Sequence, residues 1–105
     1  MEKILLHDNS FDLKNSGIKV YNDRLSVNLI NVSNTLDEIE TMFSDPGKIT
    51  LVSEAGETLR IFDDYNKLVE IRKNKDVALS YEIVDDEEVV TRGDVVTVVL
   101  AKENG

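Results

Sequence analysis

The fold is decided by the stretch Thr35-Leu-Asp-Glu-Ile-Glu-Thr-Met-Phe-Ser-Asp-Pro-Gly, which continues as Lys48-Ile-Thr-Leu-Val-Ser-Glu-Ala-Gly-Glu-Thr-Leu-Arg-Ile-Phe-Asp-Asp-Tyr-Asn-Lys-Leu-Val-Glu-Ile-Arg-Lys. Its first part has the form of a short capped helix, and its second part that of consecutive β-strands. The stretch therefore indicates architecture, and it contains no recognisable catalytic motif.

The helix signal is strongest at its start. Thr35 with Glu38 has the form of a capping box, in which the hydroxyl accepts from the Glu38 amide and the carboxylate accepts from the Thr35 amide. Acidic residues in the first turn also suit the positive end of the helix dipole. An apolar stripe follows at helical spacing, made of Leu36, Ile39, Met42 and Phe43. Pro46 disfavours helical geometry at the residue before it, so the helix is predicted from about 35 to 44.

The rest of the chain alternates predicted strands and turns. Strands at 48–53 and 58–62 flank a turn at 54–57, where Gly56 supplies the positive φ of a tight loop. A third strand is predicted at 67–72; a helix over 65–75 is the alternative, but alternating Val69 and Ile71 favour a strand. Before residue 35, strands are separated by turns at 8–10, 15–17 and 22–23. After residue 72, turns at 73–76, 85–88 and 92–94 bound strands at 78–84 and 95–101.

These patterns predict one β-rich domain over residues 1–105, of the α+β class. Most strands should be antiparallel, arranged as a sandwich or a barrel, with the single short helix at about 35–44. Leu25, Val27 and Leu29 have the period-two pattern of a half-buried strand. Residues 95–101 carry apolar side chains on both faces of the predicted strand, which is typical of a central strand covered on both sides.

Composition narrows the classes of function. The chain has 105 residues, a formal net charge of −9 and no cysteine, so thiolate chemistry and disulfides are excluded. The negative charge disfavours binding to nucleic acid and to anionic membranes. No apolar run approaches the ~20 residues that span a bilayer, and no export signal is visible. We expect a soluble protein, located in the cytoplasm of a host cell or incorporated in a virion.

Four local features have some of the form of a functional site, and each has a simpler structural interpretation. His7, the only histidine, lies at a predicted strand end without a catalytic or metal-binding companion. The acidic runs at 63–66 and 85–88 lack the ligand spacing and loop glycine of a calcium site, so we expect solvated turns. Arg92-Gly93-Asp94 matches an integrin-binding tripeptide, and residues 31–33 match a glycosylation acceptor. We therefore predict no catalytic, cofactor-binding or metal-binding residue.

The strand faces carry a surplus of apolar side chains. A single helix has difficulty covering all of them, so either two sheets cover each other or another subunit or partner supplies a layer. The residues in question are Ile30, Val32, Phe62, Val69, Val89, Val90 and the second face of 95–101. Leu79, Tyr81 and Ile83 share one face of the predicted strand at 78–84.

Residues 35–73 resemble small uncharacterised proteins of phages and prophages of Gram-positive bacteria. The resemblance lies in Thr35-Leu-Asp-Glu-Ile-Glu-Thr-Met-Phe, in the strand–Gly–strand hairpin, and in Tyr65-Asn-Lys-Leu leading into the next strand. The acidic insertion at 85–88 departs from that pattern. The resemblance implies a virion-associated or tail-associated accessory component and supplies no catalytic residue.

We therefore expect a non-enzymatic phage or prophage structural or accessory protein that acts through protein–protein contacts. It would bind a protein partner or self-associate as a homo-oligomer, through an apolar sheet face or an edge strand. The alternative is an acidic inhibitor that imitates nucleic acid and blocks a basic enzyme. A small hydrolase or metal enzyme centred on His7 is the third hypothesis.

Overall fold

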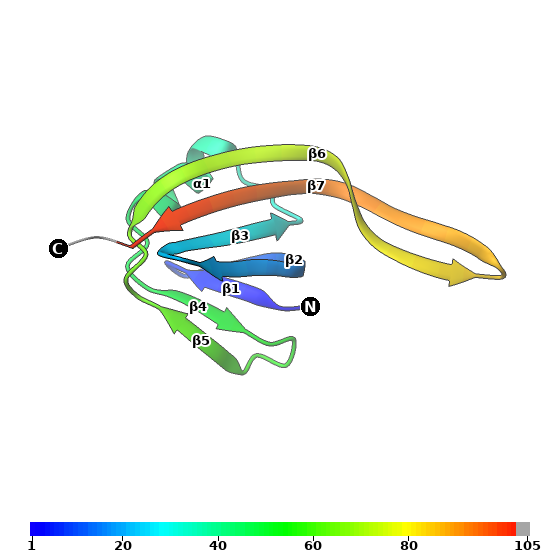
Figure 1. Cartoon of the computed structure of the whole chain (residues 1–105), viewed down its shortest axis with the longest axis horizontal. Coiled ribbons are helices and arrows are strands. Elements are labelled where there is room, and N and C mark those ends of the chain that lie inside the picture. Colours follow the sequence, from blue (N-terminus) through cyan, green and yellow to red (C-terminus); the bar gives the residue numbers. More distant parts are fainter. Residues whose placement is uncertain (103–105) are drawn as a thin grey trace.

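Seven strands and one helix make up residues 1–102, which is the part of the chain that the computed structural model describes (Figure 1). In chain order they are β1 (Lys3–Leu6), β2 (Asn9–Tyr21), β3 (Arg24–Ile30), α1 (Leu36–Ser44), β4 (Ile49–Val52), β5 (Thr58–Phe62), β6 (Lys67–Val84) and β7 (Glu87–Ala101). The predicted α+β class, mostly antiparallel β with a short helix, is confirmed.

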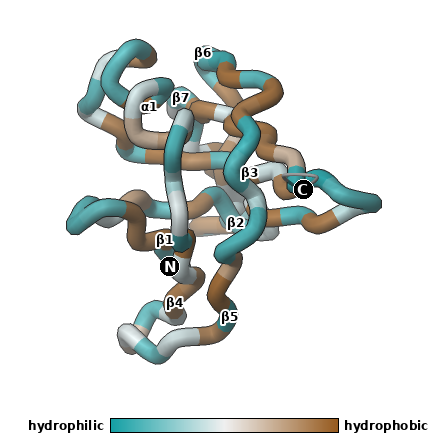
Figure 2. Tube along the Cα trace, turned by 90° about the vertical axis from the view of Figure 1, so that its left-hand side faces the viewer, coloured by the Kyte–Doolittle hydropathy of each residue, from teal (hydrophilic) through white to brown (hydrophobic). Residues whose placement is uncertain are grey.

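The strands belong to one sheet with the order β5-β4-β1-β2-β3-β7-β6, and every neighbouring pair is antiparallel. The sheet curls strongly, so that β4 and β5 lie far below β6 when the molecule is viewed from the end opposite the long hairpin (Figure 2). Within residues 1–102 the edge strands β5 and β6 do not pair with each other, so the curled sheet stays open. One face of a single sheet therefore surrounds the core.

The core is built from the inward faces of the strands and one face of α1. Ile39 and Phe43 of α1 are fully buried, and the Phe43 ring lies 6.1 Å from that of Phe11 in β2. The core cluster consists of Ile4, Leu6, Phe11, Leu13, Leu25, Val27, Leu29, Ile39, Phe43, Ile49, Phe62, Tyr65, Val96, Val98 and Leu100. Burying such side chains contributes about 1.5–3 kcal/mol each, and this term holds the curled sheet and the helix together.

The predicted helix start is confirmed in detail. The Glu38 amide donates to Thr35 Oγ1 at 3.2 Å, and the Thr35 amide donates to Glu38 Oε1 at 3.0 Å. That second hydrogen bond, followed by the Thr35 hydroxyl, holds the pKa of the Glu38 carboxyl below its usual value. The capping box thus satisfies amides that the first turn of a helix leaves without intrahelical partners.

The two central strands behave as their patterns predict. In β3, Leu25, Val27 and Leu29 are fully buried. In β7, the residues from 95 to 101 are all buried, with alternate ones facing the core and the outer surface. On the outer surface, polar and long side chains of β3 and β6 flank Thr97 and Val99 in register and keep water away from them.

Three predicted turns are wrong, because the strand continues through each of them, with a bulge at 15–17 and at 73–76. Residues 15–17 lie inside β2, where the register with β3 shifts between Leu13 and Ile18 and Ser16 has a φ of 56°. Gly17 is required in this bulge, since an added Cβ would lie 2.5 Å from the Lys14 carbonyl oxygen. Residues 73–76 and 92–94 lie inside β6 and β7, which form one long hairpin.

Within residues 1–102, no helix has both the length and the apolar character that crossing a membrane would require.

Because the core lies in the body and not in the long hairpin, substitutions in the two regions should differ in their effect on stability. Phe43→Ala should lower the free energy of unfolding by about 3–5 kcal/mol, because it leaves a cavity in the packed interior. Tyr81→Ala in the long hairpin should change it by less than about 0.5 kcal/mol, because Tyr81 is 67% exposed. Urea denaturation of the two variants measures both values. Equal losses would contradict the division into a core and an exposed hairpin.

Candidate interaction surface

The distal part of the β6–β7 hairpin, residues 77–93, projects from the body of the molecule (Figure 1). We call it the arm. The protein measures 55 × 28 × 28 Å along its principal axes, and the arm accounts for the elongation. No member of the core cluster lies between residues 71 and 96. The arm is therefore held by its own strand pairing and by its attachment to the sheet.

The arm exposes large apolar side chains on both of its faces. Tyr81 pairs with Val90 in register, and Ile83 follows on the same face; Tyr81 and Ile83 are 67% and 73% exposed. Val84 and Val89 lie on the opposite face and are also exposed. The prediction that Val89 and Val90 need a partner thus remains open, whereas Ile30 and Phe62 are buried inside the chain itself.

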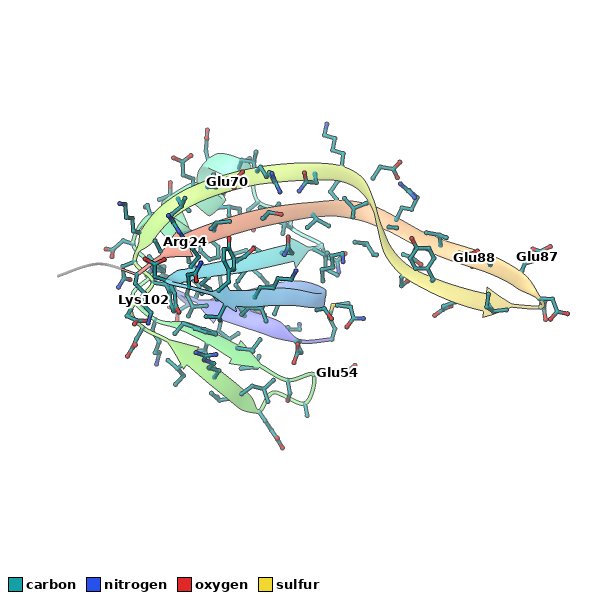
Figure 3. The ribbon with its side chains drawn as sticks, viewed as in Figure 1. Arg24, Glu54, Glu70, Glu87, Glu88 and Lys102 are labelled. Carbon is teal, nitrogen blue, oxygen red and sulfur yellow. The ribbon has the colours of Figure 1, made fainter. Side chains whose placement is uncertain are left out.

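Acidic side chains are concentrated at the end of the arm. From Val77 to Thr91 the sequence contains five carboxylates, Glu82, Asp85, Asp86, Glu87 and Glu88, and no lysine or arginine. Asp85 and Asp86 have φ values of 51° and 63°, as in the two-residue type I′ turns that close tight hairpins. Figure 3 shows Glu87 and Glu88 at the far end of the molecule, opposite Arg24 and Lys102. This group of five carboxylates is called the acidic tip.

The tripeptide Arg92-Gly93-Asp94 fixes the junction between arm and body. Arg92 donates from Nε to Asp76 Oδ1 at 2.9 Å and from Nη2 to the Asp76 carbonyl at 2.6 Å. The Asp76 amide donates to Asp94 Oδ1 at 3.3 Å. Because Asp76 has a φ of 58°, these contacts stabilise a bulge in β6. An added Cβ at Gly93 would lie 2.9 Å from Leu79 Cδ1, so the glycine makes room for that side chain.

A basic groove lies where the arm leaves the body. It has a volume of about 480 Å³ and is lined by Lys14 and Lys19 of β2 and by Arg72 of β6, with no carboxylate among its lining residues. Val77 and Val95 provide apolar lining. Arg72 also contacts Glu70 at 3.5 Å on the exposed surface, whereas no ion pair is found for Lys14 or Lys19 among residues 1–102. The lining of the groove therefore carries positive charge.

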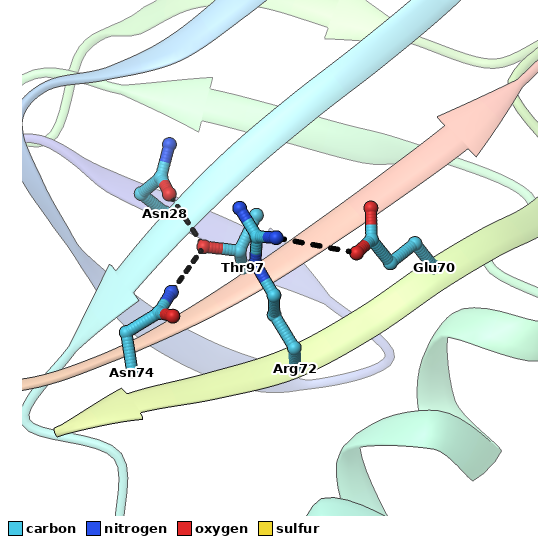
Figure 4. A network of polar contacts seen from close by, with 5 residues as sticks. All are labelled: Asn28, Glu70, Arg72, Asn74 and Thr97. Atoms are coloured by element: carbon cyan, nitrogen blue, oxygen red, sulfur yellow. Dashed lines mark hydrogen bonds and ion pairs between the residues drawn. The ribbon is translucent and has the colours of Figure 1, made fainter.

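Three lining residues of the basic groove, Asn28, Asn74 and Thr97, form a connected polar network (Figure 4). The Thr97 hydroxyl donates to Asn28 Oδ1 at 2.7 Å and accepts from Asn74 Nδ2 at 3.3 Å. The Asn28 side chain in turn donates from Nδ2 to the Gly17 carbonyl at 3.2 Å. These contacts join β2, β3, β7 and β6, so the network holds together the strands that position the cations.

The network makes Thr97 sensitive to loss of its hydroxyl. Thr97→Val keeps the shape but removes the partner of two amide side chains, and it should lower the free energy of unfolding by about 1–3 kcal/mol. Thr91→Val, on the exposed arm, should change it by less than about 0.5 kcal/mol. Urea denaturation compares the two variants. A neutral Thr97→Val variant would show that the network does not hold the strands.

His7 has a structural position in the turn between β1 and β2. Its Nε2 donates to the Asp45 carbonyl at 2.9 Å, and its φ is 48°. Asp45 is the C-cap residue of α1, so the histidine joins the end of the helix to a hairpin turn. Among residues 1–102, the only hydrogen bond of the imidazole is the one to this backbone carbonyl.

The acidic turn at 63–66 is partly incorporated in the body. Tyr65 is buried and packs edge-on against Phe62, with ring centroids 5.9 Å apart. Asn66 Oδ1 accepts from the Gly47 amide at 2.9 Å, and Asp64 faces Lys102 at 3.7 Å. This turn is thus more than the solvated tip that the sequence suggests. Among residues 1–102, no three histidine or acidic side chains converge as a metal site requires.

Asn31, in the glycosylation-type triplet, uses its side chain inside the protein. Its Nδ2 donates to Asp12 Oδ2 at 3.0 Å. That hydrogen bond, followed by attraction to Lys3 at 3.4 Å, holds the pKa of Asp12 below its ordinary value of 3.8 against the opposing effect of burial. The charged form of Asp12 therefore stabilises the fold above the ordinary pKa, and this contribution is lost as the pH falls through the lower folded-state value.

We expect Asn31→Gly to raise the pKa of Asp12 toward 3.8, because the variant removes the donor and keeps a residue that tolerates the φ of 56° at this position. The stability that Asp12 contributes should then be lost at higher pH than in the parent protein. NMR titration of the carboxyl group measures the shift. Asn9→Ala, which removes a hydrogen bond to the His7 carbonyl and none to Asp12 among residues 1–102, is the control that should leave Asp12 unchanged.

Another apolar patch lies at the opposite edge of the sheet. Leu5 and Ile61 lie in one cross-strand row on either side of Thr50, and Leu59 follows on β5. Leu5 is 41% exposed, Leu59 50% and Ile61 49%. This patch lacks the concentration of charge that marks the arm, and it provides a matched control surface.

The sequence patterns identified the acidic tip and part of the apolar surplus but missed the basic groove. Lys14, Lys19 and Arg72 are separated in sequence and meet only through the register of β2, β3, β7 and β6. Their signal in the sequence is limited to lysines at two positions of an alternating strand.

In comparisons with protein-family models, characterised proteins and solved structures, nothing matches this chain significantly.

Proposed function

We propose that this chain is a non-enzymatic structural or accessory protein of a phage or prophage, associated with the tail or virion and acting through protein–protein contacts. The observation that supports it is the projecting arm, which carries exposed Tyr81 and Ile83 on one face and Val84 and Val89 on the other.

The exposed apolar side chains of the arm are energetically unfavourable in a protein without a partner, because they stay in contact with water. Its apolar side chains gain little from folding, since they lie outside the core cluster. Burial against a partner would contribute about 25 cal/mol per Å² of apolar surface. Contiguous exposed apolar surface with a polar rim is characteristic of interaction sites, and the arm with its acidic tip has this composition.

The faces of the arm are better suited to a partner than its edge. The pairing of β6 with β7 is irregular at three places: between Leu68 and Glu70 in the body, between Asn74 and Val77 at the root of the arm, and between Ala78 and Ser80 within the arm. Bulges of this kind on an edge strand hinder the addition of another strand. Of the two modes expected from sequence, contact through an apolar sheet face is therefore favoured.

The phage assignment rests on the resemblance of residues 35–73, and mass spectrometry of purified particles tests it. We expect the chain at a fixed ratio to the major particle proteins. Tyr81→Ser with Ile83→Ser should reduce incorporation by about tenfold, the effect of losing 1.4 kcal/mol of binding. Leu59→Ser with Ile61→Ser removes similar exposed side chains elsewhere and should have little effect. Absence from particles, or equal effects of the two double variants, would overturn the proposal.

The acidic tip favours a second candidate, an inhibitor that imitates nucleic acid and blocks a basic enzyme. Carboxylates spaced along a projecting hairpin could contact a phosphate-binding groove. Binding to a basic enzyme should then weaken steeply as salt shortens the Debye length from about 10 Å at 0.1 M to about 3 Å at 1 M. Salt-insensitive binding would exclude this candidate.

A further inference from the structure

We propose that the arm of one copy binds the basic groove of a second copy, so that the acidic tip lies against Lys14, Lys19 and Arg72. This inference rests on the proposed function, because it names the partner surface through which the protein self-associates. The occupant of the groove is thus a second copy of this chain.

Charge complementarity supports this occupant. The acidic tip has five carboxylates and no basic residue, while the groove has three cations and no carboxylate among its lining residues. The groove also has apolar lining at Val77 and Val95, and the arm presents Val84 and Val89 beside Glu82 and Glu87 on one face. Both surfaces therefore combine charge with small apolar side chains.

The contact cannot form within one chain. β6 and β7 pair in register up to Val84 and Glu87, so the hairpin is continuous to its end. Val77 and Asn74, at the root of the arm, line the groove. The clamp of Arg92 on Asp76 fixes that root. A continuous hairpin directed away from its root cannot place its tip there, so the tip must come from another molecule.

Each copy then offers one arm and one groove. Such a contact either closes as a reciprocal pair or continues from copy to copy. In both arrangements the tip brings negative charge to a surface whose own cations, Lys14 and Lys19, have no carboxylate partner among residues 1–102. Opposite charges across an interface steer association and select the partner.

Charge exchange between purified variants tests this contact. Arm variant Glu82→Lys, Glu87→Lys, Glu88→Lys leaves the turn residues Asp85 and Asp86 in place, because their positive φ values suit aspartate better than lysine. Groove variant Lys14→Glu, Lys19→Glu, Arg72→Glu makes the matching change. Circular dichroism first establishes that both variants are folded, and light scattering at low salt then measures mass.

We expect the parent protein to self-associate, with weaker association as salt rises. Each variant alone should self-associate at least about tenfold more weakly, since like charges then meet at the contact. An equimolar mixture should recover association, because the basic tips meet acidic grooves and the acidic tips meet basic grooves. The control Glu2→Lys, Glu40→Lys, Glu57→Lys changes net charge as the arm variant does, at exposed positions elsewhere, and should associate like the parent.

A monomeric parent protein, a groove variant that associates normally, or a folded mixture that does not recover association would overturn the inference. These results are separable from failure of the proposed function. Incorporation into particles by a protein that is monomeric in solution would leave the proposed function standing and remove the arm–groove contact. A self-associating protein that is absent from particles would overturn the proposed function and leave the arm–groove contact standing.

Discussion

The pairing of β7 with β3 holds the curled sheet and the arm together as one continuous structure. Arg24 to Leu29 pair with Ala101 to Val96, and this half of β7 is buried on both faces. The other half of the same strand leaves the body and forms one side of the arm. Because one strand belongs to both parts, the arm extends the sheet directly without a flexible linker. Its direction follows from the core and from the bulge at Asp76.

This arrangement separates the residues of the core from those of the exposed arm. The core cluster uses side chains from the curled sheet, α1 and the turn at Tyr65, and none from the arm. The arm and the groove combine exposed charge with apolar side chains, which is unfavourable in a packed interior and useful at a surface that binds and releases partners. Substitutions of exposed side chains on the arm should therefore have little effect on folding.

How much could be predicted from sequence depended on the range of the interactions. Thr35 and Glu38 are neighbours on one helical turn, so the capping box and the helix start were predictable. Bulges and turns contain the same types of residue, because both need positive φ and polar side chains that form local hydrogen bonds. Only the pairing with a partner strand distinguishes a bulge from a turn. The turns predicted at 15–17 and 73–76 are wrong for this reason, whereas residues 92–94 have no positive φ and continue β7 opposite the bulge at 73–76. The basic groove depends on register across four strands, which local patterns do not encode.

The β3–β7 pairing also has a kinetic consequence. Asn28 and Thr97 are joined by the Thr97 hydroxyl although they lie 69 residues apart in the sequence. Contacts of such high sequence separation form late, because the entropy of closing a long loop is lost before the contact is gained. Until β7 arrives, β3 presents an unpaired edge beside Leu25, Val27 and Leu29. We therefore expect the docking of β7 to be the slow step of folding, with the edge of β3 open to aggregation until it occurs.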